Sequence, residues 1–393
     1  MRIAAIVGGL MLIVTSLAEA KENDVTWNGY INLVGGILQN NRVSDTSANT
    51  QHPGYYSYEN RFTAMEDSLI ALQAKKVIDD KFSVTGQIMS RGRTDSFQSS
   101  LNWAYVTYNI TDLSTLRCGR LGLPVYYYSD FVDVGLAYHW VAPPRETYPV
   151  LPAFQGANYL RYDSISNIDF TTEIFGGAFD QKDAIPGGRG EVTSQGRDVM
   201  GAALTVGPVG WLTGRLMYMT GSGNSNIDIN LGAIANNPVV AADINKILNT
   251  GFSKEEYYNA FIRADFEHWF LMSEGIVANG GGLLNLKVRR WYISSGMRFN
   301  KVTYHVTFAK SEDTFADVAV HFSNALTRAV APILADSFAN NNTSWTVGAR
   351  IDTSRTTAVK VELYQYEEFA SGRGETAGIG KNALLRVAFN ASF

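Results

Sequence analysis

The feature that most constrains this chain is a recurring segment of about ten residues in which apolar and polar side chains alternate. In residues 82–91, Val84 and Ile88 fall on one face of an extended chain, whereas Thr85 and Gln87 fall on the other. Residues 345–352 and 359–364 repeat the pattern, with arginine, lysine or glutamate on the polar face. A period of two is that of a β-strand, and such charged faces are unsuited to a dry core. The segments therefore predict strands with one apolar and one wet face.

About sixteen such segments cover the chain, and an even number in this range is typical of transmembrane barrels. We therefore expect an all-β fold, a transmembrane antiparallel up-and-down β-barrel of about sixteen strands. The expected strands lie near residues 25–38, 60–76, 82–91, 101–111, 115–121, 156–163, 168–179, 197–207, 211–221, 255–267, 269–278, 285–299, 302–311, 343–352, 357–368 and 383–393.

The connections between these segments alternate in length, which is an independent signal. Short turns near 79–81, 111–114, 207–210, 300–301 and 352–356 alternate with long polar connections near 39–59, 122–155, 179–196, 220–254, 311–342 and 370–381. Transmembrane barrels have short periplasmic turns and long external loops, and an even strand count places both termini in the periplasm.

The N-terminal residues have the order of an export signal. A basic Arg2 precedes an apolar run from Ile3 to Val14, and the tripeptide Ala18-Glu19-Ala20 follows it. This pattern predicts a signal peptide over residues 1–20, leaving residues 21–393 as the barrel. A retained anchor is the alternative, but a spanning helix needs about 20 apolar residues.

Composition agrees with a membrane barrel and argues against several other classes. The chain has 20 Tyr, 20 Phe and 7 Trp, and membrane barrels place aromatic residues in girdles at both interfaces. A net charge of −4 is not that of a nucleic-acid binder. The five histidines and the single Cys118 show no metal-ligand spacing, and neither a G-x-S-x-G motif nor a P-loop occurs. We therefore expect no metal, no cofactor and no enzymatic activity, with an outer-membrane hydrolase as a remaining alternative.

Three segments carry a resemblance to a known family. They are the Gly-containing opening strand from Val25 to Leu33, the very long connection after the fifth strand, and a closing strand, 384–393, that ends on Phe393. In these the chain resembles the general porins, trimeric sixteen-stranded barrels of the Gram-negative outer membrane. The resemblance implies a homotrimer and makes Phe393 part of the signal that the outer-membrane assembly machinery reads. It also implies that apolar faces near both termini, including Ile31, Leu33, Val387 and Phe389, turn partly toward a neighbouring subunit.

The connection from 122 to 155 is similar in position to the family's third loop, which folds inward and narrows the pore. It lacks the family's acidic Pro-Glu-Phe-Gly-Gly type of run and is rich in aromatic residues. Its length exceeds what a hairpin needs. We expect this pore-constricting loop to place Asp130 and Asp133 opposite the wall arginines Arg91, Arg120 and Arg161. The alternative is a loop that caps the barrel or folds against a neighbouring subunit.

The remaining charges of the strands are expected on the lumen face, where water solvates them. Opposite charges on the loop and the wall would create a transverse field across a narrow aqueous passage. These lumen-facing residues are Arg215, Arg263, Asp265, Arg350, Lys360, Glu362 and Arg386.

Two channel functions follow from this architecture. The first is passive diffusion of small hydrophilic solutes and ions through a water-filled pore. The second is a substrate-selective channel, for example for sugars, in which the loop's aromatic residues form a stacking platform. Those residues could equally be packing that holds the loop to the wall. They are Tyr126, Tyr127, Tyr128, Phe131, Tyr138 and Trp140.

Overall fold

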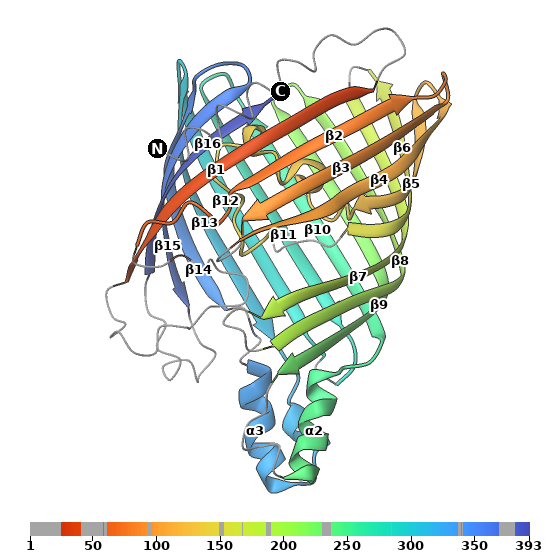
Figure 1. Ribbon diagram of the computed structural model, residues 1–393, viewed down its shortest axis with the longest axis vertical. Helices are drawn as coiled ribbons and strands as arrows, with labels where there is room; N and C mark the ends of the chain where they lie inside the picture. Colours follow the sequence, from red (N-terminus) through yellow and green to blue (C-terminus); the bar gives the residue numbers. More distant parts are fainter. Residues whose placement is uncertain are drawn as a thin grey trace.

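Sixteen antiparallel strands form one closed barrel in the computed structural model (Figure 1). The structure describes residues 25–40, 58, 61–92, 96–148, 153–166, 168–185, 190–229, 237–283, 285–336, 339, 341–368 and 382–393. The expected signal peptide, 1–20, lies outside the described residues. The strands are β1 (Thr26–Asn40), β2 (Leu69–Val77), β3 (Phe82–Gly92), β4 (Phe97–Thr111), β5 (Ser114–Gly122), β6 (Ala153–Ile165), β7 (Ile168–Ile185), β8 (Gly190–Val209), β9 (Leu212–Ile229), β10 (Ser253–Asp265), β11 (Trp269–Gly280), β12 (Lys287–Phe299), β13 (Val302–Thr314), β14 (Asn342–Asp352), β15 (Thr357–Glu368) and β16 (Asn382–Ser392).

Each strand pairs with its neighbours in sequence, and β1 pairs with β16 to close the sheet. Closure leaves no unpaired edge, which a chain in hydrocarbon requires. The predicted number of strands and the antiparallel barrel are confirmed, and each predicted segment overlaps one strand.

Alternation along the strands separates the two faces of the wall. In β3 the side chains of Val84 and Ile88 are exposed on the outer surface, whereas Ser83, Thr85 and Gln87 are buried inside. Aromatic pairs gather on the outer surface at the tight-turn end. The ring of Phe266 stacks between those of Trp211 and Trp269, with centroids 5.2 and 4.2 Å away. This is the expected arrangement for a barrel whose outer wall meets lipid.

The C-terminus closes the barrel at the tight-turn end. The main chain of Phe393 exchanges hydrogen bonds of 2.8 and 2.9 Å with Gly29 of β1. A Cβ atom at position 29 would lie 2.4 Å from the ring of Phe393. Glycine is therefore required where the terminal ring lies across β1.

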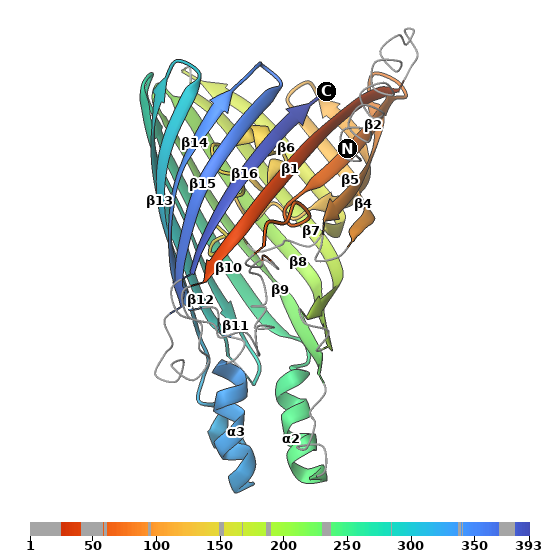
Figure 2. The same ribbon diagram turned by 60° about the vertical axis from the view of Figure 1, so that its left-hand side comes forward.

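The opposite end of the barrel carries two α-helices that the sequence analysis did not predict. Helix α2 (Pro238–Leu248) lies in the connection after β9, and α3 (Ala325–Asp336) lies in the connection after β13. They project from the barrel side by side (Figure 2). Buried Ile244 and Ile247 of α2 pack with Ala331 and Ala335 of α3. A 3₁₀ turn, η4 (Val318–His321), precedes α3.

One predicted loop is wrong. The connection expected at 179–196 is largely an extended hairpin, because β7 continues to Ile185 and β8 begins at Gly190. Within the described residues, no helix is long and apolar enough to cross a bilayer.

Candidate functional site

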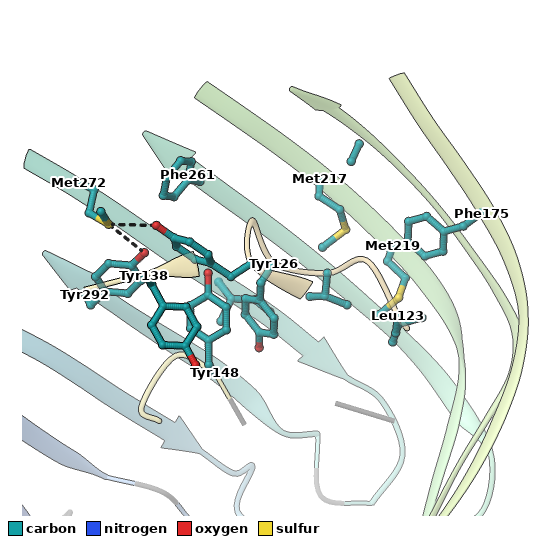
Figure 3. Packing of buried hydrophobic residues seen from close by; sticks show 14 of the residues in the cluster. Leu123, Tyr126, Tyr138, Tyr148, Phe175, Met217, Met219, Phe261, Met272 and Tyr292 are labelled. Carbon is teal, nitrogen blue, oxygen red and sulfur yellow. Dashed lines mark hydrogen bonds between the residues drawn. The ribbon is translucent and has the colours of Figure 1, made fainter. Parts of the chain in front are cut away.

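The connection between β5 and β6 lies inside the barrel. Its described part, residues 123–148, is called the inner loop here and contains two short 3₁₀ turns, η1 (Ser129–Phe131) and η2 (Gly135–Ala137). Its buried side chains share one apolar cluster with lumen-facing residues of β7 to β13. Figure 3 shows Tyr126, Tyr138 and Tyr148 of the loop gathered beside Met272 and Tyr292 of the wall. The inner loop therefore occupies part of the lumen.

The aromatic residues of the inner loop mainly pack against the wall. The Tyr127 ring stacks on Phe261 of β10 with centroids 3.9 Å apart. The indole of Trp140 meets the ring of Tyr292 edge-on at 5.3 Å and is 1% exposed. Its Nε1 donates to Thr307 Oγ1 of β13 at 2.8 Å, so the buried N–H is paired. Rings used in this way are not free to stack on a solute.

Polar groups of the wall hold the first half of the inner loop by its main chain. Arg215 of β9 donates to the carbonyl of Pro124 at 2.7 Å and forms an ion pair with Glu173 of β7 at 3.2 Å. Glu274 of β11 accepts from the Tyr127 N–H at 2.8 Å. Since all three wall side chains are buried, these bonds are shielded from competing water.

Charged groups from β14 and β15 hold the second half in the same way. Arg350 donates to the carbonyl oxygens of Leu136 and Tyr138 at 2.8 and 2.7 Å. The ammonium group of Lys360 donates to the carbonyl of Trp140. Lys360 is fully buried, so its charge is met by main-chain dipoles rather than by water.

A buried ion pair completes this attachment. Glu362 of β15 accepts from the Val141 N–H at 2.7 Å and from Arg386 of β16 at 2.8 Å. Removing one partner from such a buried set leaves an uncompensated charge, which is strongly destabilising. The wall and the inner loop are therefore coupled through charges that water does not reach.

The acidic edge of the inner loop faces a different part of the wall. Asp133 forms an ion pair with Arg91 of β3, and its carbonyl accepts from Asn32 of β1 at 2.7 Å. Asp130 lies 3.7 Å from the guanidinium of Arg117 of β5, and 48% of the Asp130 side chain is exposed. Two carboxylates thus face two arginines of β3 and β5 in partly wet surroundings.

Gly135 allows the loop to approach the β1–β16 seam. A Cβ atom there would lie 2.3 Å from Asn390 Nδ2 and 2.6 Å from Asn32 Oδ1. A side chain at position 135 would therefore have to displace these two hydrogen-bonded amides.

His139 is a buried histidine of the inner loop. Its Nε2 lies 3.0 Å from Ser294 Oγ, and its ring lies 4.7 Å from that of His305. Burial lowers the pKa of His139 well below its ordinary value of 6.5, and the nearby His305 and Lys360 lower it further. The loop is consequently docked with a neutral imidazole.

No protein-family model and no curated protein matches this sequence. Solved structures match its architecture over nearly its whole length. The outer-membrane channel DcaP of Acinetobacter baumannii is 11% identical with a TM-score of 0.56, and the match covers 95% of this chain and 99% of that one. OmpF of Salmonella typhi is 11% identical with a TM-score of 0.53, covering 94% and 98%. The anion-selective porin of Comamonas acidovorans is 11% identical with a TM-score of 0.51, covering 94% and 99%.

The chain has the fold of the outer-membrane porins. Within this porin fold, the inner loop occupies the position that the sequence analysis assigned to a third loop after the fifth strand.

Two arginines expected opposite the aspartates lie on the outer face of the barrel wall. In β5, Arg117 and Leu121 point inward, so alternation directs Arg120 outward, where it donates to the carbonyl of Leu101 at 3.0 Å. Arg161 lies on the outer face of β6 and binds Asp163 through two hydrogen bonds of 2.8 and 2.9 Å. Both arginines were expected inside because the whole inner face was expected to be wet. The inner loop makes the inner face apolar in this region, so these two arginines face outward.

The other expected lumen-facing charges do lie on the inner face. Their surroundings differ from the solvated ones expected, since Lys360, Glu362 and Arg386 are at most 2% exposed beneath the inner loop. Arg263 and Asp265 pair with each other near the tight-turn end. Arg215 and Arg350 hold the loop as described above.

Sequence reasoning missed Arg117 and Glu274. Glu274 lies two residues after Met272 in β11 and shares its inner face, so its inward position was available from the strand pattern. The hydrogen bond that Glu274 accepts from the loop could not be predicted, because nothing in the sequence shows that the main chain of Tyr127 lies beside it. Arg117 and Arg120 are three residues apart and therefore fall on opposite faces, and choosing between them required the register.

Proposed function

We propose that the protein is an outer-membrane porin that lets small hydrophilic solutes and ions diffuse passively. The observation that carries this proposal is the asymmetry of the inner loop. One side is buried against β7 to β16, whereas the edge with Asp130 is exposed and faces Arg117 and Arg91. The narrowest passage would run along that edge, between the loop and the wall of β3 to β5, with opposite charges across it.

The same proposal implies how the barrel is oriented in the outer membrane. The helix-bearing end with the long connections would face the outside, and the tight turns would face the periplasm. Residues 1–20 would be removed as a signal peptide, and Phe393 would be read by the assembly machinery. The apolar residues exposed on the outer wall, such as Ile174, Leu204 and Leu216, suit contact with lipid.

Arg117 and Arg120 provide a matched pair for testing the passage. Arg117→Gln should raise the preference for cations in planar bilayers, because it removes a positive charge beside Asp130. Arg120→Gln makes the same chemical change on the outer face and should leave the reversal potential unchanged. Equal reversal potentials for the two variants would contradict the proposed passage, and an absence of any conductance would contradict the channel itself.

We further propose a homotrimer. Leu33, Val387 and Phe389 are about two-fifths exposed on the outer face of the adjoining strands β1 and β16. The outward Arg120 supports a protein-covered surface, because an arginine facing lipid near the bilayer centre costs about 2–4 kcal/mol. Chemical cross-linking in mild detergent should yield trimers, and monomers alone would refute this assembly.

A substrate-selective channel remains the second candidate. The buried positions of Tyr126, Tyr128, Tyr138 and Trp140 argue against their forming an exposed platform for sugars. A cavity elsewhere in the lumen supports selectivity.

A further inference from the structure

A cavity of about 340 Å³ lies in the lumen beside the first turn of the inner loop. Leu123, Val125 and Tyr126 of the loop form one boundary, and the inner faces of β7 to β12 form the others. Neither Asp130 nor Asp133 lines this space, so it is distinct from the charged edge of the loop. A volume of this size suits a small ligand.

The lining of the cavity combines apolar side chains with the main chain of glycines. Phe179, Met219 and Ile276 contribute apolar surface, and Gly196 and Gly223 contribute backbone. A Cβ atom on Gly196 would lie 2.2 Å from the ring of Phe179. The missing side chain therefore lets that ring lie close against β8, at the border of the cavity.

A second glycine, Gly223, makes room for the carboxylate of Glu255. A Cβ atom on Gly223 would lie 2.2 Å from the carboxyl carbon of Glu255, so Glu255 rests against the main chain of β9. Its Oε2 accepts from the hydroxyl of Tyr257 at 2.8 Å. Among the described residues no cationic side chain forms an ion pair with Glu255.

The other charged group of the cavity is already neutralised. Arg290 binds Asp313 through hydrogen bonds of 2.8 and 3.1 Å, and Asp313 is buried. Lys254 pairs with Glu256 at 2.7 Å on the outer face of β10, away from the cavity. The cavity thus presents one uncompensated carboxylate beside apolar surface.

We propose that this cavity is a binding subsite for small cations that carry a ring, such as a primary amine joined to one aromatic ring by a short linker. The ring would contact Phe179 and Ile276, and the ammonium group would donate to Glu255. An anion of the same shape would be repelled by Glu255 and would find Arg290 bound to Asp313. The inference deepens the proposed channel function by naming a solute class, and its permeation step rests on that function.

Binding can be measured without any assumption about transport. Isothermal titration calorimetry on the purified protein in detergent would compare phenethylamine with 3-phenylpropionate, which has a similar ring and linker but the opposite charge. Methylamine tests the contribution of the ring. We expect phenethylamine to bind at least tenfold more tightly than either compound.

Glu255→Gln and Glu256→Gln form the matched variants, because the two residues are adjacent in β10 and point to opposite faces. Glu255→Gln should weaken phenethylamine binding at least tenfold, and Glu256→Gln should leave it unchanged. Equal binding of the amine and the carboxylate, or unchanged binding in Glu255→Gln, would overturn the subsite.

Bilayer recordings distinguish failure of the proposed subsite from failure of the proposed channel function. Phenethylamine should cause brief interruptions of the single-channel current in the wild type and fewer in Glu255→Gln. A conducting protein that binds no amine would overturn the subsite and leave the channel intact. A protein that binds the amine but does not conduct would overturn the channel and leave the subsite.

Discussion

The two sides of the inner loop contact the wall through different kinds of side chain. Toward β7 to β16 the loop is attached by buried rings and by charges that water does not reach, such as Lys360 and Glu362. Toward β3 and β5 its aspartates meet arginines that remain partly exposed. Buried contacts are costly to disrupt, whereas exposed ion pairs contribute little to stability. The first side should therefore determine whether the loop stays docked, and the second should influence which ions pass.

The largest effect is expected from Trp140→Ala on the buried side. The indole is 1% exposed and donates to Thr307, so its loss should lower the free energy of unfolding by about 3–5 kcal/mol. Urea unfolding in detergent, followed by circular dichroism, measures this. Phe131→Ala removes a half-buried ring at the margin of the apolar cluster, next to the exposed Asp130, and should cost about 1 kcal/mol. Equal losses of unfolding free energy in the two variants would contradict the claim that the buried side holds the loop in place.

A smaller, pH-dependent effect is expected from His139. Since its pKa is lowered in the folded protein, the unfolded chain binds a proton below about pH 6.5 that the folded chain does not. Its contribution should therefore be complete above that pH and decline as the pH falls below it, by at most about 1.4 kcal/mol per pH unit. His139→Gln should reduce this dependence in urea unfolding between pH 7 and about pH 5. An unchanged slope would mean that His139 is not held neutral by its burial.

The strands were predictable from the sequence because lipid and water impose a strict alternation on them. Segments such as 82–91 and 357–368 coincide with β3 and β15 within one residue at each end. The same reasoning failed at Arg120 and Arg161, where the inner loop covers the lumen face and makes Leu121 and Phe154 part of an apolar core. Alternation then no longer tells the inside from the outside.

Strand alternation also could not predict the two α-helices or the contacts of the inner loop. Helix α2 has a local start signal, since the side chain of Asn237 accepts from the N–H groups of Val239 and Val240, and Pro238 occupies the first position of the helix. The helix does not stand out in the sequence because it is short and lies in a long connection. The attachment of the loop depends on pairs that are far apart in sequence, such as Tyr127 with Glu274, and sequence spacing carries no information on these pairs.

The most direct test of the account is the reversal potential of the double variant Asp130→Asn, Asp133→Asn in a salt gradient. Both carboxylates lie on the exposed edge of the loop, so the ratio of cation to anion permeability should fall by on the order of twofold to fivefold at low salt. Asp163→Asn removes a carboxylate from the outer face and should have no effect. An unchanged reversal potential in the double variant, with conductance and folding intact, would contradict the claim that this edge of the loop borders the passage.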